Sequence, residues 1–302
     1  MKLVTFERAG GEGWGALVAD QTIVDLTGKL QDTSGKPIRS ILSLLDDERE
    51  LERVGEIVEK AEQVYALSDV RLRAPILWPR KLLCLAGNYS EHIREGGGEV
   101  PEKASMTPRV FMKPPTTTII GYGDPIVVPR NGRWIDWECE LAVVIGKRAR
   151  FVQAAEASTY IAGYTVMNDV SERELHVPEQ RTSRPGDNWF DWLNGKWLDT
   201  FAPMGPSLTL KDEIPDPHRL RITLRVNGVT KQDSDTGRMI FSIPELVEWC
   251  SSLVTLEPGD VISTGTPSGV GKALGEFLKS GDTVESEVEG IGVLRNPVVA
   301  ES

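Results

Sequence analysis

Short runs in which apolar and polar residues alternate occur along most of the chain, and they predict a mostly β structure. Within residues 3–26, three such runs separated by turns predict a small strand meander. Apolar residues then recur at helical spacing from Ile41 to Val58, which predicts one broken helix or two. Pro75 and Pro79 are typical of a domain junction. We therefore predict an α+β chain with a small N-terminal α/β domain over residues 1–75 and a mostly β domain over residues 76–302.

The stretch from Trp134 to Gly146 is the centre of the larger part. It begins polar and aromatic and ends β-branched, which predicts a strand entering a core. Glu138 and Glu140 are two residues apart, so both would lie on one face of that strand. A second predicted strand ends at Asp169. The three carboxylates together would form an all-oxygen site for a hard divalent ion, although alternating charges more often mark a solvated sheet face.

The stretch from Asn88 to Glu95 offers a candidate base. Asn88 or Ser90 could cap a short helix in which His92 and Glu95 are neighbours. A neighbouring carboxylate orients an imidazole and raises its basicity, which suits a general base for water. The three glycines that follow predict a mobile segment of the kind that covers an active site. The alternative is a surface His–Glu pair.

Three further features follow Asp169. Residues 170–176 predict a helical turn, and residues 178–194 predict a long irregular loop, either functional or an ordered surface or dimer contact. Lys196 comes next and could stabilise a developing negative charge, unless it is merely solvated. The glycine-rich turn over residues 265–271 could present backbone N–H groups and hydroxyls to an anion. Its glycine spacing does not match a dinucleotide or P-loop motif.

Composition narrows the possible partners and surroundings. The formal net charge of −11 over 302 residues argues against binding to nucleic acid or to an anionic membrane. The three cysteines are widely spaced and odd in number, which is typical of reduced thiols. No apolar run is long enough for a membrane span, and residues 1–7 lack a signal-peptide core, so we expect a cytoplasmic protein.

The order of seven motifs resembles the fumarylacetoacetate hydrolase family over residues 80–300. The motifs are residues 87–95, 111–114, 136–146, 163–171, 195–206, 226–228 and 263–271. The resemblance implies a mixed β-roll or sandwich fold for the catalytic domain, usually as a homodimer. It also implies Mg²⁺ or Mn²⁺ in the site, with Ca²⁺ possible in crystals.

The resemblance assigns roles to residues that match the family's motifs. Glu138, Glu140 and Asp169 match its metal ligands, His92 and Glu95 its water-activating pair, Lys196 its catalytic lysine and Thr266 its contact to a substrate carboxylate. Further candidates for substrate binding are Gly265, His176, Arg181, Arg184 and Lys113. His176 and the 178–194 loop depart from the usual family pattern, and both lie where the substrate would be recognised.

These assignments imply a metal-dependent hydrolase that cleaves a C–C bond in an acylpyruvate, a small anionic β-diketo acid. His92 would activate water, and the metal and Lys196 would stabilise the released enolate. Two alternatives use the same enolate without an activated water, namely a decarboxylase or an isomerase of oxaloacetate-like or hydroxymuconate-like 2-keto acids. A third alternative is a metal-stabilised binding module without catalysis.

Overall fold

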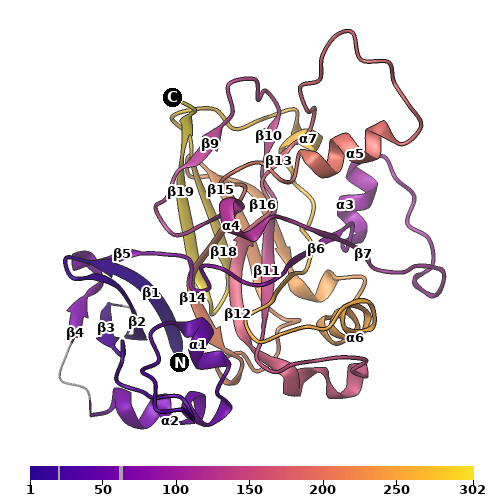
Figure 1. Cartoon of the computed structure of the whole chain (residues 1–302). Helices are drawn as coiled ribbons and strands as arrows, with labels where there is room; N and C mark the ends of the chain where they lie inside the picture. Colours follow the sequence, from indigo (N-terminus) through magenta and orange to yellow (C-terminus); the bar gives the residue numbers. More distant parts are fainter. Residues whose placement is uncertain (20, 61–63) are drawn as a thin grey trace.

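Strands dominate the computed structural model, which describes residues 1–19, 21–60 and 64–302 (Figure 1). The described strands form one large mixed sheet, a five-stranded sheet and a two-stranded ribbon. The large sheet runs in the order β4 (Val64–Ala66), β3 (Thr22–Asp25), β2 (Gly11–Val18), β1 (Lys2–Arg8), β14 (Ala202–Leu210), β12 (Ile161–Asn168), β11 (Cys139–Ile145), β17 (Val261–Ser263), β6 (Leu82–Ala86) and β7 (Arg109–Met112), with β5 (Arg71–Leu72) on β1 and β8 (Ile119–Ile120) on β14.

The other strands and the helices surround this sheet. The five-stranded sheet has the order β16 (Val229–Asp235), β15 (Arg221–Val226), β18 (Thr283–Val288), β19 (Gly292–Ala300) and β9 (Ile126–Val128), and the ribbon pairs β10 (Ile135–Asp136) with β13 (Ser171–Glu172). The α-helices are α1 (Ile41–Leu45), α2 (Glu48–Val58), α3 (Ser90–Glu95), α4 (Pro115–Thr118), α5 (Asp187–Asn194), α6 (Ile243–Leu253) and α7 (Gly271–Leu274). The 3₁₀ helices are η1 (Leu67–Asp69), η2 (Lys103–Ser105), η3 (Ala154–Tyr160), η4 (Lys211–Glu213) and η5 (Thr236–Arg238).

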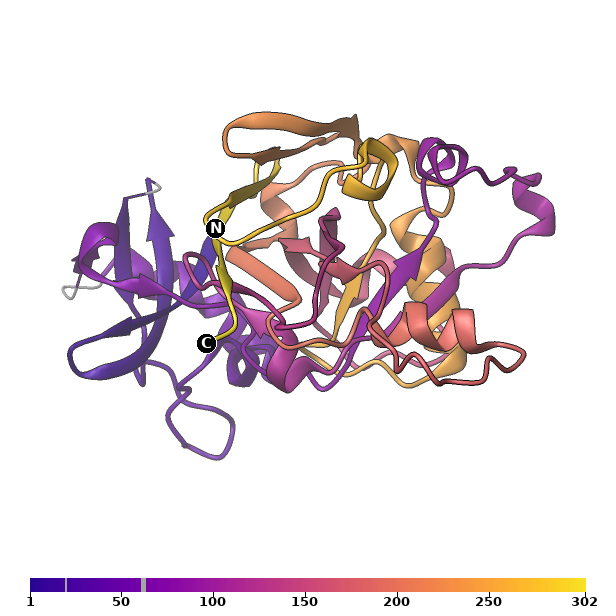
Figure 2. The same cartoon turned by 90° about the horizontal axis from the view of Figure 1, so that it is seen from above.

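The N-terminal residues form the expected meander, β1 to β3, followed by two helices rather than one. Strand β1 also pairs antiparallel with β14, with Lys2 opposite Thr209 and Leu3 opposite Leu208. The N-terminal unit is therefore a continuation of the large sheet. Seen from above, it lies at the end of the molecule opposite α3 and α5 (Figure 2).

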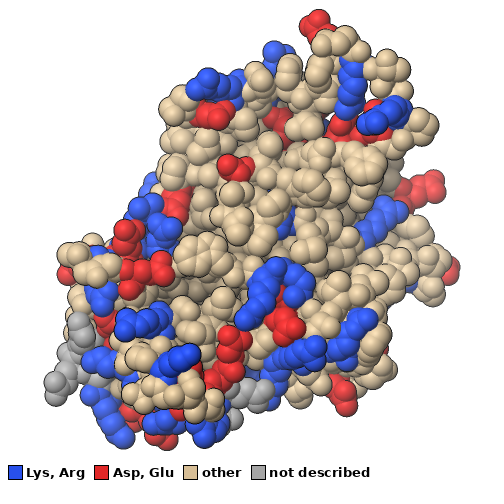
Figure 3. All heavy atoms as spheres, viewed as in Figure 1, with Lys and Arg blue, Asp and Glu red and all other residues tan. Residues whose placement is uncertain are grey.

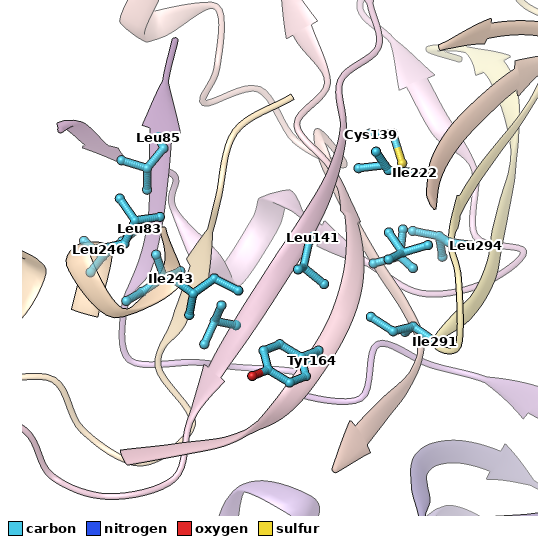
Figure 4. Packing of buried hydrophobic residues seen from close by; sticks show 14 of the residues in the cluster. Leu83, Leu85, Cys139, Leu141, Tyr164, Ile222, Ile243, Leu246, Ile291 and Leu294 are labelled. Atoms are coloured by element: carbon cyan, nitrogen blue, oxygen red, sulfur yellow. The ribbon is translucent and has the colours of Figure 1, made fainter. Parts of the chain in front are cut away.

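Strand β11 is buried on both faces, which explains its β-branched run. On one face, Leu141 and Val143 belong to a core shared with the five-stranded sheet and α6, and Figure 4 shows Leu141 between these layers. On the other face, Ala142 and Val144 belong to a core shared with the N-terminal strands and α1. Each large aliphatic side chain buried in this way contributes about 1.5–3 kcal/mol. The two cores fix the ends of β11 and β12, where the candidate carboxylates lie.

The structure corrects two local predictions. Residues 170–176 contain no helical turn, because Ser171 pairs across the ribbon with Asp136. The 178–194 loop is irregular only in its first part, since α5 occupies residues 187–194. Trp189 and Trp192 are three residues apart on α5, and Trp192 packs against the core over Phe111. This apolar contact stabilises a helix that the polar flanking sequence does not indicate.

On the face in Figure 3, positive and negative side chains are interspersed around a broad uncharged area, so the net negative charge is not gathered there. Among the helices of the described residues, none has the length and apolar character needed to cross a membrane.

Candidate metal centre and active site

Three carboxylates meet where β11 begins and β12 ends. Glu138 directly precedes β11, Glu140 is its second residue and Asp169 directly follows β12. A backbone hydrogen bond of 2.9 Å from Asp169 N to Glu138 O joins the two chain segments. One carboxylate oxygen from each residue lies within 4.8 Å of the other two, and all three residues are buried. The arrangement fits an all-oxygen site for a hard divalent cation.

Three cations balance two of these carboxylates. Lys196 Nζ donates to Glu138 Oε2 at 2.8 Å and to Asp169 Oδ2 at 2.6 Å. Lys113 Nζ donates to the other oxygen of Asp169 at 2.5 Å, and Arg173 Nη2 donates to Glu138 Oε1 at 2.5 Å. Burial alone would raise the pKa of Glu138, but Lys196 and Arg173 nearby lower that pKa below its usual range. Glu138 is therefore held as a carboxylate by fixed positive charge.

Glu140 has different surroundings. Its Oε2 accepts hydrogen bonds from Ser263 Oγ at 2.5 Å and from the backbone N–H of Gly265 at 2.9 Å. Its Oε1 is buried and has no hydrogen-bond partner in the described part of the chain. Burial and the charges of Asp169 and Glu138 raise the pKa of Glu140 well above its usual range. A buried oxygen without a partner beside two other carboxylates fits a divalent cation, which would supply the missing charge.

The glycine-rich turn after β17 holds carboxylates of the protein itself. Besides the bond from Gly265 to Glu140, Gly269 N donates to Glu95 Oε2 at 2.7 Å and Gly271 N donates to Asp136 Oδ1 at 2.5 Å. This corrects the prediction that these backbone N–H groups would bind an anion from outside. The turn instead links three acidic side chains from separate parts of the chain.

The candidate base lies on α3. His92 Nδ1 lies 2.7 Å from Glu95 Oε1, and the second oxygen of Glu95 is held by Gly269. Neither Asn88 nor Ser90 caps this helix, because the N-cap is Tyr89 and makes no side-chain cap hydrogen bond. Asn88 is instead used inside the fold, where its amide donates to the carbonyls of Phe241 and Thr264.

A pocket of about 660 Å³ joins these groups. Its polar lining includes His92, Glu138, Arg173, Lys196 and Thr266. The Thr266 hydroxyl donates to the carbonyl of Cys139 at 2.9 Å and accepts from the Gln232 amide at 2.8 Å. A base, a carboxylate of the metal cluster and two cations therefore face one cavity.

The remaining predicted substrate contacts lie outside this pocket. Lys113 is fully buried behind Asp169, where it also donates to the carbonyl of Val170. Arg181 forms a two-bond ion pair with Asp191, while Arg184 has 80% of its side chain exposed. His176 is exposed and does not line the pocket. The structure thus gives Lys113 the role of holding Asp169 in place, rather than that of contacting a substrate.

Arg173 is a site residue that sequence reasoning missed. Its Nε donates to Asp136 Oδ2 at 2.7 Å, so the guanidinium bridges Asp136 and Glu138. Asp136 is itself fixed by the Gly271 and Lys272 backbone N–H groups. Arg173 lies four residues after Asp169, but only the pairing of β13 with β10 brings it to Glu138.

A sequence comparison assigns the family. The profile described as "Fumarylacetoacetate (FAA) hydrolase C-terminal" matches residues 81–299. The chain belongs to the fumarylacetoacetate hydrolase family. A mitochondrial oxaloacetate tautomerase of Bos taurus is 44% identical over 234 residues, which cover 77% of this chain and 70% of the relative. An uncharacterized protein of Pyrococcus abyssi (strain GE5 / Orsay) is 48% identical over 223 residues, covering 74% and 92% respectively.

Solved structures of the family have the same fold along the whole chain. A 5-carboxymethyl-2-hydroxymuconate delta-isomerase from Mycobacterium smegmatis matches with 34% identity and a TM-score of 0.75, covering 100% of both chains. A maleylpyruvate hydrolase from Sphingobium sp. SYK-6, in complex with manganese (II) ion and pyruvate, matches with 28% identity and a TM-score of 0.78, again covering 100% of both chains.

These matches confirm the predicted mostly β family fold and the prediction that the chain is an enzyme. The manganese complex of a relative and the carboxylate cluster together support a divalent metal in the site.

Proposed function

We propose that the protein is a metal-dependent enzyme that interconverts the keto and enol forms of an oxaloacetate-like 2-keto acid. The observation that carries this proposal is the convergence of three components on one pocket. These components are the carboxylate cluster, which reaches the pocket through Glu138, the ammonium of Lys196, and His92 with its partner Glu95. The similarity to an oxaloacetate tautomerase at 44% identity supports the choice of reaction.

The carboxylate cluster sets where the substrate would bind. A divalent ion held by Glu138, Glu140 and Asp169 would act as a Lewis acid towards the keto oxygen. Lys196 uses two of its three N–H donors on Glu138 and Asp169, so its third N–H is available for an oxygen in the pocket. That ammonium would stabilise the negative charge that develops on the keto oxygen.

The His92 imidazole moves the proton. A hydrogen bond from Nδ1–H to Glu95 leaves Nε2 as the acceptor. In the forward direction Nε2 takes a proton from the carbon beside the keto group, and the imidazolium then gives that proton to the keto oxygen, which restores the neutral imidazole. One C–H bond breaks and one O–H bond forms, so the reaction needs no further reactant.

Hydrolysis of a C–C bond in an acylpyruvate is a second candidate. The pair of His92 and Glu95 favours it, because an oriented imidazole can also take a proton from water. Water attack on the distal carbonyl would then cleave the substrate and release pyruvate, with Lys196 stabilising the enolate before it is protonated. The similarity to a maleylpyruvate hydrolase supports this reaction at lower identity.

Two assays on one preparation separate these reactions. Loss of enol absorbance in fresh oxaloacetate solutions reports tautomerisation, and pyruvate release is measured from oxaloacetate and from a panel of acylpyruvates. With Mn²⁺ we expect enol decay faster than with Mn²⁺ alone and no pyruvate release above that of Mn²⁺ alone, and chelator should abolish the acceleration. Pyruvate from an acylpyruvate would instead identify a hydrolase, and pyruvate from oxaloacetate a decarboxylase.

Substitution of His92 tests the base. Because general-base catalysis contributes roughly 10²–10⁴-fold, His92→Ala should lower the turnover number by about this factor. Mn²⁺ binding, measured by calorimetry, should stay close to that of the wild type, since His92 is not part of the carboxylate cluster. The matched control is His176→Ala, which removes an exposed histidine outside the pocket. Full activity of His92→Ala would exclude the role of base.

A further inference from the structure

The pocket has an aromatic wall that neither the proposed proton transfer nor the carboxylate cluster uses. Trp189 and Trp192 on α5 line the pocket together with Ile93 and Phe241, which come from other parts of the chain. The two indole rings are stacked, with centroids 4.9 Å apart and planes inclined by 23°. The pocket thus has aromatic and apolar lining residues in addition to its polar and charged ones.

This wall is held in place by neighbouring contacts. Trp192 packs edge-on against Phe111, with ring centroids 5.1 Å apart. Arg181 forms its two-bond ion pair with Asp191, which ties the preceding loop to α5. The outer ring, Trp189, nevertheless has 51% of its surface exposed. A large aromatic surface is therefore presented to the cavity by a fixed helix and is only half covered by the protein.

The wall lies next to the catalytic cation. Lys196 Nζ lies 5.6 Å from the centroid of the Trp192 ring and 5.3 Å from that of Phe111. A substrate longer than oxaloacetate whose keto oxygen reaches Lys196 would therefore place its far end beside the Trp192 ring. The volume of about 660 Å³ lies in the range of roughly 300–1,000 Å³ that is typical of pockets for drug-sized ligands, well above what a four-carbon acid requires.

The charges around the wall argue against a carboxylate at the far end of a substrate that is longer than oxaloacetate and reaches the wall. The faces of indole rings carry negative potential, which disfavours an anion. Arg181 and Arg184 in the preceding loop pair with Asp191 and Asp187 instead of lining the pocket. Among the lining residues that the structure describes, Arg109 is the guanidinium outside the carboxylate network, and it is exposed.

We propose that Trp189 and Trp192 form a subsite for a planar, uncharged group, either an aromatic ring or a conjugated chain, at the end of the substrate away from the 2-keto acid. This inference rests on the proposed function for the position of the keto acid. It extends that function from oxaloacetate itself to larger 2-keto acids whose tail stacks on the indoles.

Equilibrium dialysis of the Mn²⁺-loaded protein tests the subsite without relying on turnover, because it counts bound ligand in either tautomer. The probes are pyruvate without a tail, phenylpyruvate with a planar tail, 4-methyl-2-oxopentanoate with a branched apolar tail and 2-oxoglutarate with a charged tail. Phenylpyruvate should bind most tightly. Stacking on an aromatic ring corresponds to a roughly 2- to 12-fold gain in affinity.

Substitutions of the two tryptophans test whether the gain in affinity comes from the aromatic wall. Trp189→Leu should lose most of the preference for phenylpyruvate and leave the affinity for pyruvate unchanged. Trp192→Leu serves as the second variant, and its folding is checked by Mn²⁺ binding because Trp192 also packs on Phe111. The control is Trp78→Leu, which removes an exposed tryptophan outside the pocket.

Other results would overturn the subsite. Equal binding of phenylpyruvate and 4-methyl-2-oxopentanoate would show that the wall does not select planar groups. If 2-oxoglutarate bound most tightly, and Arg109→Gln lost that affinity, the pocket would instead bind a charged tail at its mouth. If phenylpyruvate bound selectively but the protein did not accelerate enol decay of oxaloacetate, only the proposed reaction would be rejected. Enol decay without any preference for phenylpyruvate would reject only the subsite.

Discussion

At the scale of single residues, Glu138 and Glu140 differ in electrostatic surroundings although they are two positions apart. Glu138 contacts two cations, whereas Glu140 contacts a hydroxyl and a backbone N–H group and keeps one buried oxygen without a partner. Glu140 therefore depends more than Glu138 on a bound cation for the compensation of its charge.

Replacement of Glu140 by glutamine tests this dependence. A metal that binds only the folded state stabilises it by about 2.7 kcal/mol at a free concentration of one hundred times Kd. Mn²⁺ should therefore raise the melting temperature of the wild type, and Glu140→Gln should lose most of that increase. Without metal, the variant should be at least as stable as the wild type at neutral pH, because a buried, repelled carboxylate is gone. Glu99→Gln, at the exposed mouth of the pocket, is the control. If Mn²⁺ raised the melting temperature of Glu140→Gln as much as that of the wild type, Glu140 would not be a metal ligand.

Site residues can be predicted from the sequence when their partners are close to them along the chain. Glu138 with Glu140 and His92 with Glu95 are close in sequence, so strand and helix periodicity alone place each pair on one face. Arg173 could not be found in this way, because its two partners lie across a strand pairing. The sequence predicts Lys113 as a substrate contact, because it does not reveal that Asp169 covers this side chain.

At the scale of elements, the glycine-rich turn of residues 265–271 connects the base to the metal cluster. Gly265 N holds Glu140 and Gly269 N holds Glu95. Both glycines have positive φ, and a Cβ on Gly269 would lie 2.1 Å from the carbonyl oxygen of Lys231. The sequence predicted a turn that presents N–H groups. It could not predict that acidic side chains of the protein itself would occupy them, because those come from distant segments.

Substitution of Gly269 by alanine should therefore impair catalysis. The added Cβ forces the turn away from Lys231 and displaces the N–H that holds Glu95, and misplacement by about 1 Å can cost on the order of 10²-fold in rate. Mn²⁺ affinity should fall much less, because Glu140 is held by Gly265 and Ser263.

Gly275→Ala is the matched control, with a similar positive φ and open space around the new Cβ. It should lose about 1–2 kcal/mol of stability and retain its activity. Equal turnover of the two variants would exclude the proposed role of the turn.

At the scale of the whole molecule, the predicted boundary at residue 75 crosses a continuous sheet. The order of strands within the N-terminal unit was predictable, since a meander pairs neighbours in sequence. The pairing of β1 with β14 was not, because it joins residues about 200 positions apart and depends on both hydrophobic cores being formed. Strand β14 is also the neighbour of β12, which ends at the metal cluster.

This continuity predicts a single cooperative unfolding transition for the full chain. The core on one face of β11 includes Leu3, Trp14 and Ile41 from the N-terminal unit together with Ala142 and Val144, so loss of either part exposes apolar surface of the other. Differential scanning calorimetry should show one peak, with equal calorimetric and van't Hoff enthalpies. Mn²⁺ should move the whole peak to higher temperature, although the carboxylate cluster lies outside residues 1–75. Two peaks, of which only the second responds to Mn²⁺, would instead indicate an N-terminal domain that unfolds independently.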